Sequence, residues 1–172
     1  PENTFVLTEI GDIYEKLEEY EKALEYYKKI EEVGGDDYYT LTHIGWSLNQ
    51  LDRDEEALDY YMRALEGEED NIWLLSQIGV TLGAIKRYEE GVEYLKKAEE
   101  LGRNDAWLNS ELGWQLARME KHEEAVNYFK KAEELGRNDP WLYNQLGWNL
   151  GVLDKFEEEL EYLYKSKEIS ED

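Results

Sequence analysis

The sequence has no cysteine and only two prolines among its 172 residues. Without cysteine, the chain has no disulfide, no thiolate metal ligand and no cysteine nucleophile. No apolar run approaches the ~18 residues that a membrane-spanning helix needs, and no signal-peptide pattern opens the chain. We therefore expect no membrane association, and the absence of cysteine is compatible with the cytoplasmic location that we expect.

Basic residues are also scarce. The chain carries 19 Lys and Arg against 42 Asp and Glu, which gives a formal net charge of −23. Nucleic-acid phosphates and anionic membrane surfaces repel a chain this acidic, so we expect it to bind neither. Hydrophobic residues nevertheless make up 41% of the chain and aromatic residues 13%, which is enough to form a core and argues against disorder.

The sequence offers little material for catalysis. It has two histidines, His43 and His122, and neither belongs to an HExxH motif or any other metal-ligand pattern. His122 stands where other repeats have Tyr or Phe, which indicates a packing role. Paired carboxylates such as Glu55-Glu56 indicate a solvated helix face, because an acid–base pair needs an enclosed site to separate its pKa values. We predict no enzyme activity, no metal and no cofactor.

Glycine recurs at positions 11, 45, 79, 113 and 147, always 34 residues apart. The neighbouring residues recur too, because Leu146-Gly147-Trp148 repeats Leu112-Gly113-Trp114. A fixed period of this length predicts stacked copies of one small unit, that is, a solenoid. We predict one solenoid over residues 1–172 with repeats at 4–37, 38–71, 72–105, 106–139 and 140–172.

Two segments of each repeat show helical spacing of apolar residues and none shows the alternation of a strand, so we predict an all-α fold. Gly102 and Gly136 follow second segments and are predicted C-caps. Asp105 and Asp139 precede first segments and are predicted N-caps. Pro140 stands at a first helical position, where its missing N–H is harmless. Short charged turns separate the segments of a pair, which predicts antiparallel hairpins.

The chain resembles the tetratricopeptide repeat family over nearly its whole length. The resemblance rests on the 34-residue unit, on the recurring glycine, and on small residues in the second helix. These small residues are Ala23, Ala57, Gly91 and Ala125 early in that helix, and Ala64, Ala98 and Ala132 later. The resemblance implies a right-handed superhelical α-solenoid of five antiparallel helix pairs, whose first helices line a concave groove. It also implies a protein-interaction module.

Carried onto this chain, the groove positions of the family predict a nearly neutral surface with a ladder of indoles, small hydroxyls and amides. Its predicted partner-binding residues are Trp46, Ser76, Gln77, Val80, Ser110, Trp114, Arg118, Asn144, Gln145 and Trp148. Such a groove favours a peptide or partner protein of apolar or weakly basic character. The groove indoles could instead only pack against one another. Trp73, Trp107 and Trp141 open their helices and are predicted to pack against the preceding repeat.

A structural role is the alternative to peptide binding. The third and fourth repeats share the segment 96–105 unchanged with 130–139, as expected of copied, engineered or self-assembling repeats that have no ligand of their own. Both terminal helices carry apolar residues on predicted outer faces, including Phe5, Leu160 and Tyr164. These surfaces predict weak end-to-end self-association or continuation into a longer array, with association strengthened by salt because of the −23 charge.

Overall fold

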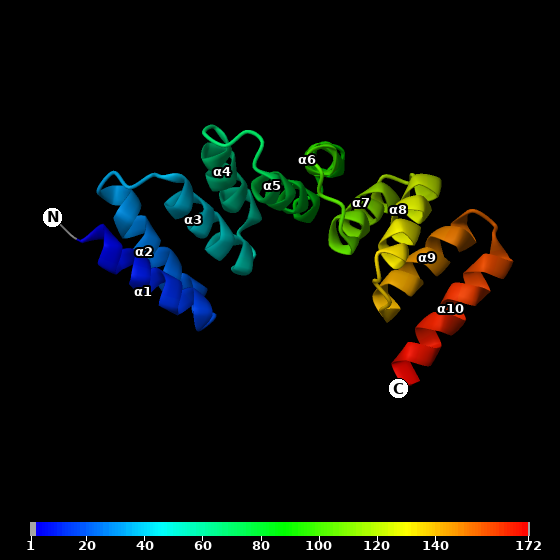
Figure 1. Ribbon diagram of the computed structural model, residues 1–172. Helices are drawn as coiled ribbons and strands as arrows, with labels where there is room; N and C mark the ends of the chain where they lie inside the picture. Colours follow the sequence, from blue (N-terminus) through cyan, green and yellow to red (C-terminus); the bar gives the residue numbers. More distant parts are fainter. Residues whose placement is uncertain (1–2, 172) are drawn as a thin grey trace. The chain divides into compact units, whose positions relative to one another are not determined.

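The computed structural model describes residues 3–171, and this part of the chain consists of ten α-helices without a strand (Figure 1). The predicted all-α repeat fold is therefore confirmed. The helices are α1 (Thr4–Lys16), α2 (Tyr20–Glu32), α3 (Tyr38–Gln50), α4 (Asp54–Leu65), α5 (Ile72–Ala84), α6 (Tyr88–Glu100), α7 (Ala106–Arg118), α8 (His122–Glu134), α9 (Pro140–Val152) and α10 (Phe156–Glu171).

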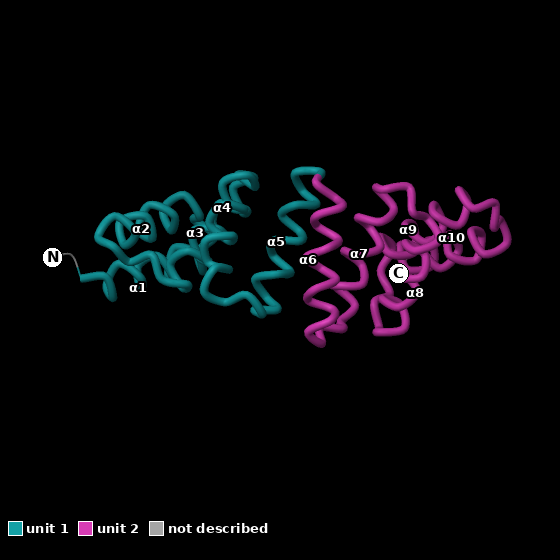
Figure 2. Tube along the Cα trace, turned by 90° about the horizontal axis from the view of Figure 1, so that it is seen from above, with its two compact units in different colours: residues 1–86 teal, residues 87–172 magenta. Residues whose placement is uncertain are grey.

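The helices form two compact units, residues 1–86 and residues 87–172 (Figure 2). Unit 1 contains α1 to α5 and unit 2 contains α6 to α10, and within each unit every helix packs against the next one in sequence. The boundary between the units falls between the two helices of the third predicted repeat. A single solenoid over residues 1–172 with the predicted repeat bounds stays a prediction.

The starts of several helices are capped as the sequence predicts. The carboxylates of Asp105 and Asp139 accept hydrogen bonds from the backbone N–H groups of Leu108 and Leu142, at 2.7 and 2.9 Å. Pro140 occupies the first turn of α9. Two further caps went unpredicted, since Asp37 caps α3 and Asn71 caps α5 in the same way. Each cap satisfies an N–H group that the helix itself leaves unpaired.

The chain reverses direction after the helices at two kinds of residue with positive φ, glycine and ordinary residues. Gly102 and Gly136 end α6 and α8 with φ of +102° and +96°, as predicted for C-caps. The turn inside each repeat instead places an ordinary residue in the left-handed region, and this residue recurs every 34 positions. These residues are Glu18, Asp52, Lys86, Glu120 and Asp154, with φ between 55° and 64°. The turns were predicted from their charged residues, but their left-handed conformation was not, because no glycine marks the position.

A close contact between the paired helices explains the recurring glycine. A Cβ atom added to Gly45 would lie 2.7 Å from the ring of Tyr61, and one added to Gly113 would lie 2.8 Å from the ring of Phe129. Both rings are fully buried. Each aromatic ring thus packs directly on the backbone of the facing helix, which only a residue without a side chain allows.

Successive second helices within a unit are joined by a repeated polar contact. In unit 2 the hydroxyl of Tyr128 donates to Glu99 at 3.0 Å, and Lys131 pairs with the same carboxylate at 3.5 Å. Burial and this hydrogen bond raise the pKa of Tyr128 to about 12. The contact recurs as Tyr60 and Arg63 with Glu31, and as Tyr162 and Lys165 with Glu133.

Candidate functional site

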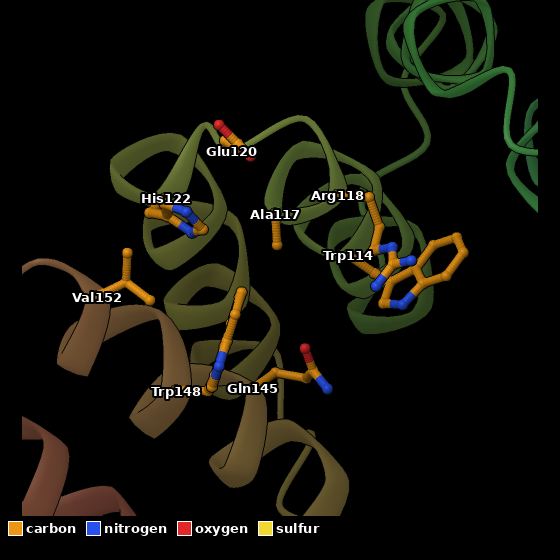
Figure 3. Close-up of a pocket in the computed structure, with 8 residues that line it drawn as sticks. All are labelled: Trp114, Ala117, Arg118, Glu120, His122, Gln145, Trp148 and Val152. Carbon is orange, nitrogen blue, oxygen red and sulfur yellow. The ribbon is translucent and has the colours of Figure 1, made fainter.

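Unit 2 contains a cavity of about 670 Å³ beside α7 and α9, the first helices of two repeats (Figure 3). Helices α7 and α9 form its walls, and the turn between α7 and α8 closes one end. Its lining residues are Trp114, Ala117 and Arg118 of α7, Glu120 and His122 around the turn, and Gln145, Trp148 and Val152 of α9. The cavity is large enough for a bulky side chain together with adjoining peptide backbone.

The two indoles of this cavity are held by aromatic rings one helix earlier in the chain. Trp114 packs edge-on against Tyr88, with ring centroids 5.7 Å apart and an interplanar angle of 82°. Trp148 packs edge-on against His122 at 5.3 Å and 72°. His122 therefore has the packing role that its repeat position predicts. These contacts fix the orientation of both rings while Trp148 remains 54% exposed.

A short chain of hydrogen bonds supports the α9 wall. The Nδ1 atom of His122 lies 2.9 Å from Oδ1 of the buried Asn149. The amide group of Asn149 in turn donates to the backbone carbonyl of Gln145 at 2.7 Å. The imidazole under Trp148 is thereby tied to the helix that carries the indole, so His122 positions the wall of the cavity as well as lining it.

The charges around this cavity are balanced. Arg118 is exposed and its Nε donates to the hydroxyl of Tyr88 at 3.4 Å, a weak bond that leaves other guanidinium donors for a ligand. Glu120 lies two residues later, in the turn that follows α7. The amide of Gln145 adds one donor group and one acceptor. The site can therefore enclose an apolar group and hydrogen-bond to peptide carbonyls around it.

Unit 1 has a smaller cavity of about 240 Å³, lined by Glu15, Thr42, His43, Trp46 and Trp73. Glu15 is the centre of its polar side. One carboxylate oxygen lies 2.8 Å from Nδ1 of His43, and the other accepts from the hydroxyl of Ser47 at 3.1 Å. The side chain of Glu15 is only 14% exposed. Both cavities therefore contain two indoles, one imidazole and one carboxylate, and the larger cavity of unit 2 adds Arg118 and the amide of Gln145.

A second polar network lies beside this cavity. Asp12 accepts hydrogen bonds from the hydroxyls of Tyr27 and Tyr39, at 2.7 and 2.8 Å. Burial, followed by the hydrogen bond to Asp12, raises the pKa of both tyrosines above the ordinary value. Asp12 and Tyr39 also line a shallow cavity of about 480 Å³ next to α1. Both phenols therefore stay protonated and serve as donors.

The structure separates the predicted partner-binding residues. Four of them line the unit 2 cavity, namely Trp114, Arg118, Gln145 and Trp148. Trp46 lines the smaller cavity of unit 1.

The remaining predicted residues lie outside these two cavities. Ser76 and Ser110 are fully buried, and each hydroxyl donates to its own helix at 2.7 Å, to the carbonyls of Ile72 and Ala106 respectively. A ligand on the surface cannot reach these hydroxyls in this conformation. Asn144 is exposed on α9, and Gln77 and Val80 are half-buried on α5.

Several lining residues were not predicted. His122, Glu120 and Val152 line the larger cavity, and Glu15 lines the smaller one. His122 had a usable signal, because it replaces Tyr88 of the preceding repeat at the position that supports a groove indole. Glu15 had none, since its neighbours His43 and Ser47 are 28 and 32 residues away in sequence.

Two of the three tryptophans that open their helices, Trp73 and Trp141, pack as predicted against the preceding repeat. Trp73 contacts Tyr61 edge-on at 6.1 Å, and Trp141 contacts Phe129 edge-on at 6.0 Å. Each indole therefore adds apolar contact area to the buried aromatic ring of the preceding helix.

Residues 3–171 contain neither a membrane-spanning helix nor a cluster of metal ligands. No helix in this range is long and apolar enough to cross a membrane. The same residues contain no group of three or more His, Cys, Asp or Glu side chains arranged to hold a metal ion.

The repeats of this chain match known family models. Two family models described as tetratricopeptide repeat match the chain, one over residues 3–70 and the other over 74–105 and 109–139. No curated protein gives a significant match by sequence.

Solved structures of MamA have a similar fold. "MamA 41-end from Desulfovibrio magneticus RS-1" superposes with a TM-score of 0.92 at 20% identity, covering 99% of this chain and 97% of that one. "MamA MSR-1 C2" gives a TM-score of 0.86 at 20% identity, with coverage of 98% and 97%. At this level of identity the likeness concerns the fold.

Proposed function

Because the chain belongs to the tetratricopeptide repeat family, a family of protein-interaction modules, we propose that it binds a peptide segment of a partner protein in the cavity between Trp114 and Trp148. An apolar or aromatic side chain of the peptide enters between the two indoles. The peptide is apolar or weakly basic, since the cavity itself carries balanced charge inside an acidic protein.

The position of the two indoles carries this proposal. Trp114 is half-buried and Trp148 is 54% exposed, although both are large apolar rings held in fixed orientations by Tyr88 and His122. An exposed, rigidly held indole at the wall of a cavity is typical of an interface anchor, because little conformational entropy is lost when a ligand covers it.

Arg118 and Gln145 supply the polar contacts. Both line the cavity beside the indoles, and their N–H groups can donate to backbone carbonyls of an extended peptide. The buried Ser76 and Ser110 have no part in this site.

A random peptide library selected against the full-length chain tests the proposal. We expect the selected peptides to contain an aromatic or aliphatic anchor, and the change Trp148→Ala to weaken their binding about 30-fold, since loss of a central interface indole costs about 2 kcal/mol or more. Isothermal titration calorimetry measures the change.

Tyr164→Ala is the matched control. Tyr164 is an aromatic residue of unit 2 that is 63% exposed but does not line the cavity. Its removal should leave the affinity within twofold. Selected peptides that bind the Trp114→Ala plus Trp148→Ala variant as tightly as the unchanged chain would place the binding surface elsewhere.

Self-association is a second candidate function, favoured by the apolar surface of α10. Phe156, Leu160, Leu163 and Tyr164 are between 41% and 63% exposed, and Phe5 of α1 is 68% exposed. Covering such side chains is favourable at ~25 cal/mol per Å². We expect static light scattering at high protein concentration to show weak association that increases with salt. A constant monomer mass up to 1 M salt would remove this candidate.

A further inference from the structure

The chain itself shows how it holds a guanidinium group. Arg103 lies 4.4 Å from the ring centroid of Trp107, and its Nε donates to Asp105 at 2.8 Å. Arg137 repeats the arrangement with Trp141, at 4.4 Å. In both places the guanidinium covers an indole while a carboxylate accepts its hydrogen bond. Stacking and ion pairing together account for such a site.

Among the three tryptophans that open their helices, Trp73 differs from Trp107 and Trp141. Trp73 opens α5 as Trp107 opens α7, but the residue four positions earlier is Glu69, where the other repeats have arginine. Trp73 is 40% exposed. Its edge rests on Tyr61, and the rest of the indole adjoins the unit 1 cavity. The repeat thus keeps the indole and replaces the arginine with an acidic residue.

The unit 1 cavity contains the groups that surround arginine elsewhere in this chain. Trp46, Trp73 and His43 provide aromatic rings, and Glu15 provides the carboxylate. Its volume of about 240 Å³ corresponds to about eight water molecules at ~30 Å³ each. That space suits one long side chain and is too small for a folded segment.

Glu15 retains the capacity to bind a fork of two N–H groups. Its oxygens face His43 and the Ser47 hydroxyl, one contact each. A carboxylate has about four lone-pair sites, so each oxygen can accept one more hydrogen bond. The contacts to His43 and Ser47 hold the carboxylate in place, which lowers the entropy lost on binding.

We propose that the cavity formed by Glu15, Thr42, His43, Trp46 and Trp73 binds an arginine side chain of the partner. This rests on the proposed function as a protein-binding module, but it concerns a site separate from the Trp114–Trp148 cavity. The guanidinium stacks on an indole and its N–H groups donate to Glu15. Arginine fits better than lysine because it is planar, more weakly hydrated and forms paired hydrogen bonds.

The charge distribution supports a basic ligand in unit 1. Residues 1–86 contain 7 Lys and Arg against 21 Asp and Glu, whereas residues 87–172 contain 12 against 21. The formal charge is therefore −14 in unit 1 and −9 in unit 2. A positively charged side chain is attracted most strongly to unit 1, whose cavity has the carboxylate of Glu15 and no lysine or arginine in its wall, whereas Arg118 accompanies Glu120 in the unit 2 cavity.

Three tripeptides test this assignment on the full-length chain: acetyl-Gly-Arg-Gly-amide, its lysine analogue, and its citrulline analogue, which is neutral but nearly isosteric with arginine. The readout is the NMR signals of the six tryptophan indole N–H groups. We expect the arginine peptide to shift the Trp46 and Trp73 signals saturably, and the citrulline peptide to bind at least tenfold more weakly. Glu15→Gln should weaken arginine binding at least tenfold.

Two variants separate this site from the proposed function. Trp148→Ala should leave arginine binding unchanged, because it lies in unit 2, whereas Trp73→Leu should reduce it even if Glu15→Gln disturbs folding. Equal binding of the arginine and citrulline peptides, or unchanged binding to both the Glu15→Gln and Trp73→Leu variants, would overturn the proposal. Equal binding of lysine would overturn the choice of a guanidinium group.

Discussion

The two units use the same helical repeat, but the cavities in them differ in size and in their polar groups. In unit 1, α1 and α3 carry Asp12, Glu15 and His43, which form hydrogen bonds with tyrosine and serine hydroxyls, and α3 also carries Trp46. In unit 2, α7 and α9 carry Trp114 and Trp148, which are supported by ring contacts with Tyr88 and His122. The residues that pack the paired helices recur between repeats, whereas the residues that line the cavities change, so packing and cavity chemistry depend on separate positions of the repeat.

Within unit 1, Tyr27 and Tyr61 occupy the same repeat position but differ in the hydrogen bonding of their hydroxyls. Tyr27 and Tyr61 both pack on the recurring glycine of the facing helix, and both rings are fully buried. The hydroxyl of Tyr27 donates to Asp12 at 2.7 Å. The hydroxyl of Tyr61 is buried without a hydrogen-bond partner among residues 3–171. The ring packs in the same way in both repeats. The contribution of the hydroxyl to stability depends on whether a nearby side chain accepts its hydrogen bond, as Asp12 does for Tyr27.

The largest effect should come from removing these two hydroxyls. Tyr27→Phe should lower the free energy of unfolding by about 2 kcal/mol, because it removes a hydrogen bond to a charged group. Tyr61→Phe should raise it, by up to about 1 kcal/mol, since an unsatisfied buried hydroxyl costs free energy. Urea denaturation followed by circular dichroism measures both, and equal losses for the two variants would contradict the comparison.

The glycine contacts should show a difference that depends on the facing residue. Gly45→Ala and Gly113→Ala should each destabilise the chain by about 1–2 kcal/mol, because the Cβ overlaps a rigid ring and overpacking outweighs the better helix propensity of alanine. Gly147→Ala should be nearly neutral, since its Cβ would lie 3.1 Å from the flexible side chain of Leu163. Thermal melting of the three variants tests this order, and a loss at position 147 as large as at 113 would refute it.

The left-handed turn residues should respond alike in both units because they belong to the scaffold. Glu18 and Glu120 have φ of 59° and 60°. Replacing either by glycine should stabilise the chain by about 0.5 kcal/mol, since glycine adopts this conformation without the steric cost. Glu124→Gly, inside α8, is the control and should destabilise by about 0.5–1 kcal/mol. A gain in one unit only would show that these turns are not equivalent.

The smallest effect should be the pH dependence of stability that Glu111 of unit 2 contributes. Burial raises the pKa of Glu111 above its ordinary value of 4.5, and Arg137 only partly opposes this. The unfolded chain therefore loses this proton first, so the contribution of Glu111 to stability falls as pH rises from 4.5 through the raised pKa. Glu111→Gln copies Gln145 of the next repeat and should remove that fall. The difference in melting temperature between variant and parent, measured from pH 4 to pH 8, should grow with pH.

Much of the fold could be predicted because the same sequence pattern occurs in five repeats. The glycine period gave the helix pairs, and Asp105, Asp139, Gly102 and Gly136 marked helix ends that the structure confirms. The charged turn at Glu120 was predicted as well, but its left-handed backbone conformation could not be, because no glycine marks the position.

The site was harder to predict, since groove positions were carried over from the family without knowledge of local bonds. Ser110 occupies a groove position, yet its short side chain bonds to the carbonyl one helical turn earlier and stays buried. The pairing of Glu15 with His43 joins residues 28 apart and depends on how neighbouring repeats stack. Such contacts follow from packing and not from any local pattern.

The most direct test of the account is an NMR titration with a library-selected peptide that contains no basic residue, observed at the indole N–H groups. If groove chemistry differs between the units as described, Trp114 and Trp148 will shift and saturate together, and Trp46 and Trp73 will not move. Saturable shifts at Trp46 and Trp73 with this peptide, while Trp114 and Trp148 remain unchanged, would contradict the account.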